Sequence, residues 1–280
     1  MTTPPPQHSE PPANLRAWLD AGSAAALNRS VAQLTLDGVR CVVKLRRPGA
    51  GRGISYVLRY LRAGALAVLC RPFVGEFPRP GVLLRNGLPY EAERLRHLRQ
   101  ANCRVPDVWW QQPGMLVLEH VGDNLPWRLR ESDPATRREL VRAVALDLAA
   151  FHARGLWHGG AQLRNLTLRN GEIWRIDFEE NIGGALSLPL AQAYDVFQTL
   201  SSLQSMRRVP EAELPQLGVL ALQTYLDARP DPAVRAALCR IARLVCGAGR
   251  VLGPLGRHLP WRDVQAFFRL ADTLRLLLHP

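Results

Sequence analysis

The segment His158-Gly-Gly-Ala-Gln-Leu-Arg-Asn165, followed twelve residues later by Ile176-Asp177-Phe178, decides how this sequence is interpreted. Two strand-like runs, 165–168 and 173–178, are joined by Asn170-Gly171, a preferred pair for a tight hairpin turn. The predicted hairpin places the amide of Asn165 beside the carboxylate of Asp177. Both groups are hard oxygen ligands of the kind that Mg²⁺ takes together with phosphate oxygens and water. We therefore predict a magnesium site at these two residues.

Two features nearer the N-terminus extend the predicted site. Residues 31–36 and 39–45 flank Asp37-Gly38, which predicts a hairpin, and Lys44 lies at the end of its second strand. Glu91 lies on a predicted helix that begins after Pro89. A buried lysine paired with a helix glutamate holds nucleotide phosphates. We expect Lys44 to pair with Glu91, and Glu93 is the alternative partner.

The remaining patterns predict an α+β, two-lobed fold with a small β-rich N-terminal lobe and a helical C-terminal lobe. We expect a β pattern over 17–47, an amphipathic helix at about 54–70, strands near 105–109 and 115–118, and a helix over 134–153. Residues 190–278 are predicted helical, with breaks near 210, 230–232 and 247–254. The predicted division is a Pro-rich, unpacked tail at 1–14, an N-terminal lobe at 15–121 that includes the 54–70 helix, and a C-terminal lobe at 122–280.

These motifs resemble those of the protein-kinase-like superfamily. Over about 17–205 the sequence looks most like the bacterial lipopolysaccharide-core kinases and the kinase subunit of the tRNA-modifying KEOPS complex. The resemblance implies a kinase-like fold that binds ATP and Mg²⁺ and transfers phosphate to a hydroxyl, such as one on a lipopolysaccharide-core sugar. It implies that the catalytic residues are Lys44, His158, Asn165 and Asp177, and that the metal ligands are Asn165 and Asp177. The cofactor-binding residues that it implies are Lys44, Glu91, Glu119 and Val121. It also implies that Asp195 holds the catalytic loop in place.

The sequence departs from the family pattern in four places. Gly160 occupies the position of the catalytic-base aspartate, Gln162 that of the phosphate-contacting lysine, and Glu179 that of the glycine after Asp-Phe. Only Ala21-Gly22-Ser23 stands where a glycine-rich loop would lie. A positioned base contributes about 10²–10⁴-fold, whereas phosphoryl transfer depends mainly on positioning and charge. Two hypotheses follow: a phosphotransferase in which Glu179 or Glu180 replaces the base or binds metal, and a catalytically impaired pseudokinase that binds nucleotide or acts as a scaffold.

The strong positive charge restricts the class of partner. A net charge of +12 and an isoelectric point near 10.6 favour phosphate-bearing partners, which include nucleotides, lipid-linked sugars, anionic membranes and nucleic acids. The helix predicted at 54–70 carries Arg59 and Arg62 beside an apolar face, so it either lies on an anionic membrane or packs against the sheet. The tryptophans follow no basic-aromatic rhythm, which makes nucleic acid a weaker third hypothesis.

Cysteine usage and the N-terminus bear on location. The five cysteines are scattered without a C-x-x-C pair, which is typical of buried thiols in a reducing compartment. Residues 1–14 lack the basic and apolar regions of a secretory signal, and no segment is long and apolar enough to span a membrane. We expect a cytoplasmic protein, with peripheral association at the inner membrane as the alternative.

Overall fold

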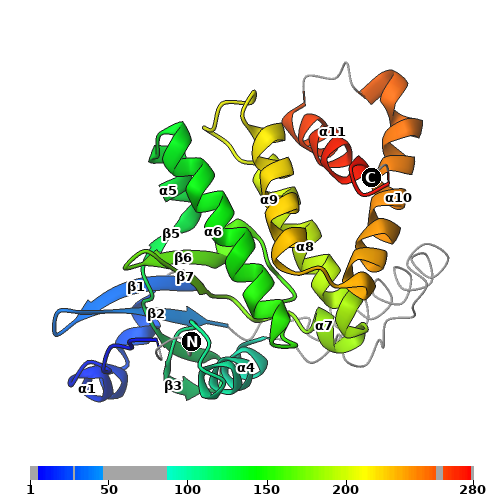
Figure 1. The fold of residues 1–280 in the computed structure, drawn as a ribbon. Helices are drawn as coiled ribbons and strands as arrows, with labels where there is room; N and C mark the ends of the chain where they lie inside the picture. The colour runs from blue at the N-terminus through cyan, green and yellow to red at the C-terminus, as the bar shows by residue number, and fades with distance from the viewer. Residues whose placement is uncertain (1–5, 28, 47–86, 257–260, 279–280) are drawn as a thin grey trace.

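The computed structural model describes residues 6–27, 29–46, 87–256 and 261–278. The chain is α+β, with a small antiparallel sheet followed by a larger helical part, an arrangement compatible with the predicted two lobes (Figure 1). The amphipathic helix predicted at 54–70 lies outside the described residues.

The antiparallel sheet has the strand order β1-β2-β4-β3. Its strands are β1 (Val31–Leu36), β2 (Val39–Leu45), β3 (Val108–Gln112) and β4 (Met115–Glu119). The β1–β2 turn is Asp37-Gly38, as predicted, and both residues have positive φ. Helix α4 (Leu88–Gln100) packs Leu95 and Leu98 against Leu116 of β4. This packing fixes α4 relative to the strand that carries Lys44.

The segment before β1 corrects the prediction of a β pattern that begins at residue 17. It contains the helix α1 (Leu15–Asp20) and the 3₁₀ turn η1 (Ser23–Ala26). Leu15, Trp18 and Leu19 recur at helical spacing and pack in one cluster with Cys41 and Val43 of β2. Ala21-Gly22-Ser23 therefore lies between two helical turns and does not connect two strands.

A three-stranded sheet, β5-β6-β7, lies between the four-stranded sheet and α6 in Figure 1. It consists of β5 (Asp123–Asn124), β6 (Leu166–Arg169) and β7 (Glu172–Arg175), and the 3₁₀ turn η2 (Leu163–Asn165) precedes β6. The Asn170-Gly171 turn has positive φ at both residues, which confirms the predicted hairpin. Its second strand ends at Arg175, three residues earlier than expected.

The helical part packs around one large apolar core. Its helices are α5 (Leu125–Glu131), α6 (Pro134–Ala153), α7 (Ile182–Ala185), α8 (Leu188–Gln204), α9 (Leu214–Ala228), α10 (Pro232–Gly256) and α11 (Arg262–Arg275). Helix α6 has the predicted bounds, and Asp133 caps it by accepting from the backbone N–H groups of Ala135 and Thr136. Within the described ranges, no helix combines the length and apolar character needed to cross a bilayer.

The break predicted at 247–254 is wrong, because α10 continues through these residues. A Cβ atom at Gly249 would lie 3.5 Å from Cβ of Ala271 on α11. This is an ordinary van der Waals distance, so Gly249 lies within α10 against α11 and does not end the helix.

Candidate functional site

The predicted pair of Lys44 and Glu91 forms in the interior. Lys44 Nζ donates to Glu91 Oε1 at 2.8 Å and to Oε2 at 2.9 Å, and the Glu91 side chain is fully buried. Glu93, the alternative partner, is exposed on α4. Lys44 is also the only lysine of the chain, since every other member of the 36 lysines and arginines is an arginine.

Two further carboxylates reach the same ammonium group. Lys44 Nζ lies 2.7 Å from Asp177 Oδ1 and 3.4 Å from Glu179 Oε1. Arg46 binds the other oxygen of Glu179 at 2.7 Å. Arg46 was not among the predicted residues. It follows Lys44 by two positions, and in an extended chain two such side chains point to the same face. The segment after β7 is thereby tied to β2.

Among the residues that the structure describes, this site has an excess of negative charge. Glu91, Asp177 and Glu179 place oxygen atoms within 4.8 Å of one another, and Lys44 and Arg46 are the described cations bonded to them. Burial raises the pKa of Glu91 to about 7; Lys44 opposes this rise, and the nearby charges of Asp177 and Glu179 add to it. Burial alone would lower the pKa of Lys44, but the attraction of Glu91 and Asp177 outweighs it and raises that pKa. Three hard carboxylate donors around fewer cations fit a divalent ion such as Mg²⁺.

Asn165 adjoins Asp177 through the backbone. The N–H of Ile176 donates to the carbonyl of Asn165 at 2.9 Å, which holds the chain on either side of the hairpin together. The Asn165 side chain is buried, and its Nδ2 donates to the carbonyl of Gly160 at 2.8 Å. Of the three predicted groups, Lys44 and Asp177 are in direct contact, whereas the amide nitrogen of Asn165 is directed to the loop at Gly160.

Gly160, which stands at the position of the catalytic-base aspartate, has room for a Cβ atom. A Cβ atom at Gly160 would lie 3.4 Å from Asn165 Nδ2 and 3.7 Å from His158 Nδ1, and no closer heavy atom surrounds it. The absence of a side chain here is therefore not imposed by backbone conformation or crowding.

Asp195 anchors the loop that precedes Asn165. One of its oxygens accepts from the N–H of His158 at 2.6 Å, and the other accepts from the N–H of Gly159 at 2.8 Å. The Nε2 atom of His152 lies 3.2 Å from the same carboxylate. Burial alone would raise the pKa of Asp195, but these partners hold it below its ordinary value. Sequence reasoning found Asp195 but missed His152, because a histidine inside α6 carries no local sign of this partnership.

His158 supports the site as a neutral, buried side chain. Its ring stacks on Phe178 with centroids 4.2 Å apart, and its Nε2 lies 3.1 Å from the carbonyl of Ile176. Burial lowers the pKa of His158 to about 4, so the ring is uncharged at pH 7. This environment suits a residue that orients the loop and the segment at Asp177 and does not suit one that exchanges protons.

Glu119 and Val121, two of the residues predicted to bind the cofactor, already bond to other parts of the protein. The Glu119 side chain is buried and accepts from the N–H of Ser9 and from Arg169, each at 2.7 Å, and it lies 2.7 Å from His8 Nδ1. The structure departs here from the predicted unpacked tail, because the His8 side chain is only 6% exposed. The carbonyl of Val121 accepts from Thr167 Oγ1 at 2.6 Å.

His8, Asp107 and Glu119 also place ligand-type atoms within 4.8 Å of one another. Arg99 already binds Asp107 at 2.8 Å, and Arg169 already binds Glu119. Two guanidinium groups balance the two carboxylates, so this cluster lacks the excess negative charge found around Lys44. It is better explained as a polar contact that holds residues 8–9 in place.

Glu119→Gln is expected to remove the contribution of this carboxylate to the pH dependence of the free energy of unfolding. Burial would raise the pKa of Glu119, but hydrogen bonds from His8, Ser9 and Arg169 outweigh it and hold that pKa at about 2. A carboxylate with a depressed pKa stabilises the fold above its unfolded value of about 4.3, and this contribution disappears as the pH falls toward 2. The substitution should therefore cost about 3 kcal/mol at pH 7 and progressively less below pH 4.5. Urea unfolding of both proteins between pH 7 and pH 3 measures the difference, with the exposed Glu93→Gln as control.

Comparisons with known proteins add no family assignment. A scan with protein-family models gives no match, and a search of curated proteins gives none at a significant level. The functional interpretation therefore depends on the geometry described above.

Proposed function

We propose that the chain is a kinase-like, nucleotide-binding protein that transfers the terminal phosphate of ATP to a hydroxyl group. The support comes from four contacts around one cation: Lys44 with both oxygens of Glu91, with Asp177 and with Glu179. The strand order of the sheet places the Lys44 strand directly beside β4, which leads into the segment at Val121. The resemblance implies that adenine contacts the backbone at residues 119–121, where the N–H of Glu119 already donates to Asp107 and the carbonyl of Val121 accepts from Thr167.

The single observation that carries the proposal is the identity of residue 44. Every other lysine-or-arginine position of the chain is an arginine, yet the buried cation that bonds to Glu91 and Asp177 is a lysine. An ammonium is a compact point charge with rotatable donors, whereas a guanidinium is a broad planar fork. A site that must hold either carboxylates or phosphate oxygens at one small cation favours the ammonium.

Each residue then has a definite task. Glu91 orients Lys44 toward the phosphates, and Asp177 together with Asn165 supplies oxygen ligands for Mg²⁺, which would neutralise charge on the phosphates. Glu179 lies in the same carboxylate cluster as Glu91 and Asp177 and would offer Mg²⁺ a further oxygen ligand. His158 and Asp195 hold the loop on which the acceptor hydroxyl would be placed, and the proposed acceptor is the hydroxyl of a small sugar-like molecule such as a lipopolysaccharide-core sugar.

A lysine-specific nucleotide probe tests the proposal directly. An ATP acyl phosphate transfers its acyl group to a lysine amine near the bound phosphates, and this chain offers only Lys44. Intact mass should show one added acyl group per chain, blocked by excess ATP with Mg²⁺ and absent in Lys44→Arg, which keeps the charge. Labelling that excess ATP does not reduce, or no labelling at saturating probe, would refute nucleotide binding at this site.

The second candidate function is a pseudokinase, and Gly160 is the observation that favours it. No carboxylate replaces the base at this position, so binding without turnover would fit the same geometry. Transfer of the terminal phosphate of ATP to water in place of the acceptor, measured as phosphate release in the presence of Mg²⁺, separates the two. Release above the uncatalysed rate supports the enzyme, and ATP-protected labelling without either release or ADP formation supports the pseudokinase.

A further inference from the structure

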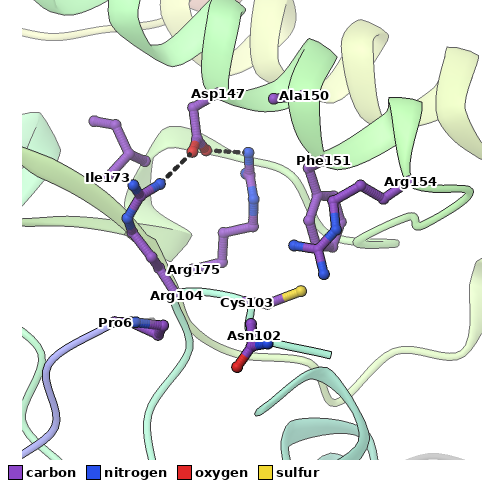
Figure 2. Close-up of a pocket in the computed structure, with 10 residues that line it drawn as sticks. All are labelled: Pro6, Asn102, Cys103, Arg104, Asp147, Ala150, Phe151, Arg154, Ile173 and Arg175. Atoms are coloured by element: carbon purple, nitrogen blue, oxygen red, sulfur yellow. Dashed lines mark hydrogen bonds and ion pairs between the residues drawn. The ribbon is translucent and has the colours of Figure 1, made fainter. Parts of the chain in front are cut away.

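A separate polar cavity lies between α6, the loop after α4, and β7, and it has a volume of about 150 Å³ (Figure 2). Its wall includes Pro6, so the N-terminal segment closes one side. None of the residues assigned above to nucleotide or metal lines it. The cavity therefore calls for an explanation of its own.

Three guanidinium groups from three different elements line this cavity. Arg104 comes from the loop after α4, Arg154 from the end of α6, and Arg175 from β7. Figure 2 shows Arg104 and Arg175 both directed at Asp147, the one carboxylate in the wall. Arg104 lies 3.7 Å from Asp147 and donates to Glu172 at 2.7 Å, and Arg175 bonds directly to Asp147. Three positive groups thus face two negative ones.

The uncompensated charge is that of Arg154. It donates to the backbone carbonyl of Ala101, a neutral acceptor, and contacts the Cys103 thiol, and no ion pair found among the described residues includes it. The neighbouring Cys103 adds no negative charge, because burial raises the pKa of its thiol. The guanidinium of Arg175 lies 4.7 Å from the ring centroid of Phe151, and this contact keeps it oriented along the cavity wall. The cavity is a cationic site with its donors already positioned.

We propose that this cavity binds the phosphate group of a small molecule. Arginine donates paired hydrogen bonds to phosphate, and donors that approach from three elements match a tetrahedral oxyanion better than a flat carboxylate. A volume of about 150 Å³ accommodates a phosphate group with a short carbon skeleton. The apolar side chains of Pro6 and Ile173 provide a surface for that skeleton.

The position of the site connects it with the segments around Lys44. Arg104 follows α4, which carries Glu91, and Arg175 precedes Asp177 by two residues. The N–H of Arg175 already donates to the carbonyl of Arg104 at 2.9 Å. A bound phosphate would add a second link between the same two segments. Binding at this cavity does not depend on the proposed nucleotide function and is measured separately from it.

Isothermal titration of inorganic phosphate and of glycerol 3-phosphate into the full chain, at constant ionic strength, tests the proposal. We expect saturable binding that Arg154→Ala weakens at least about tenfold, since a charge-assisted hydrogen bond is lost. Arg154 is exposed, so the variant should remain folded, and circular dichroism checks this. The matched control is Arg138→Ala, which removes an exposed arginine from the same helix and should bind as the wild type does.

The outcomes are distinct. Tighter binding of the ester identifies a phosphorylated metabolite as the ligand, and equal binding identifies free phosphate; both support the site. Phosphate that binds near Lys44 would be unaffected by Arg154→Ala, so equal affinity of the wild type and this variant overturns the proposal. The absence of saturable binding by the wild type also overturns it.

Discussion

Asp177→Asn should lower Mg²⁺-dependent phosphate release by about 10²–10³-fold, the loss typical when one preorganised charge-stabilising group is removed. Asparagine keeps the shape of the side chain and tolerates the positive φ of 68° at this residue. Its amide replaces the oxygen charge that Lys44 and a divalent cation would share. Phosphate release measured across a range of Mg²⁺ concentrations should show both the loss and a weaker dependence on the ion.

Stability separates a chemical effect from an unfolding one in this experiment. The Asp177 side chain is 40% exposed, and its removal relieves repulsion from Glu91 and Glu179, so the free energy of unfolding should change by no more than about 1 kcal/mol. Glu93→Gln, an exposed substitution on α4, should retain full activity. Undiminished phosphate release by Asp177→Asn would exclude this carboxylate from any role in the reaction.

Asp195→Asn should destabilise the fold by about 3–5 kcal/mol, the cost of breaking a buried charged interaction. The carboxylate is fully buried and both of its oxygens accept from backbone N–H groups, those of His158 and Gly159. An amide replaces one acceptor with a donor, so one buried N–H would face an NH₂ group and lose its partner. Because the substitution preserves volume, the loss measures hydrogen bonding and not a cavity.

Urea unfolding at pH 7 measures this effect. The matched control is Asp227→Asn on the exposed face of α9, which should alter the free energy of unfolding by less than about 0.5 kcal/mol. A loss below about 1 kcal/mol for Asp195→Asn would mean that the loop at His158 holds its conformation without this anchor.

Local patterns predicted the elements that depend on neighbouring residues. The turns at Asp37-Gly38 and Asn170-Gly171, and the bounds of α6, follow from turn and capping chemistry that is visible over a few residues. The pairing of Lys44 with Glu91 was also predicted, because a strand lysine paired with a helix glutamate is the phosphate-holding arrangement that the resemblance implies.

Contacts between distant segments were beyond local patterns. The short run at residues 15–20 has the apolar spacing of a helix, but alternation in the following strand obscured it. Arg46 with Glu179, and His152 with Asp195, join residues more than forty positions apart, and neither residue type marks its partner in the sequence. The break expected at 247–254 did not occur, because glycines inside a helix that packs on a neighbour have the same local appearance as those that end one.

The contact of His8 and Ser9 with Glu119 bears on how the protein is prepared. A proline-rich start is commonly trimmed to improve crystals or yield. Removal of residues 1–14 from this chain would remove the contacts of His8 and Ser9 with the buried Glu119 carboxylate, which would keep its ion pair with Arg169, and would uncover the Trp174 ring that His8 contacts edge-on. Shortened versions of the protein should therefore retain residue 8, and any tag is better placed at the other end.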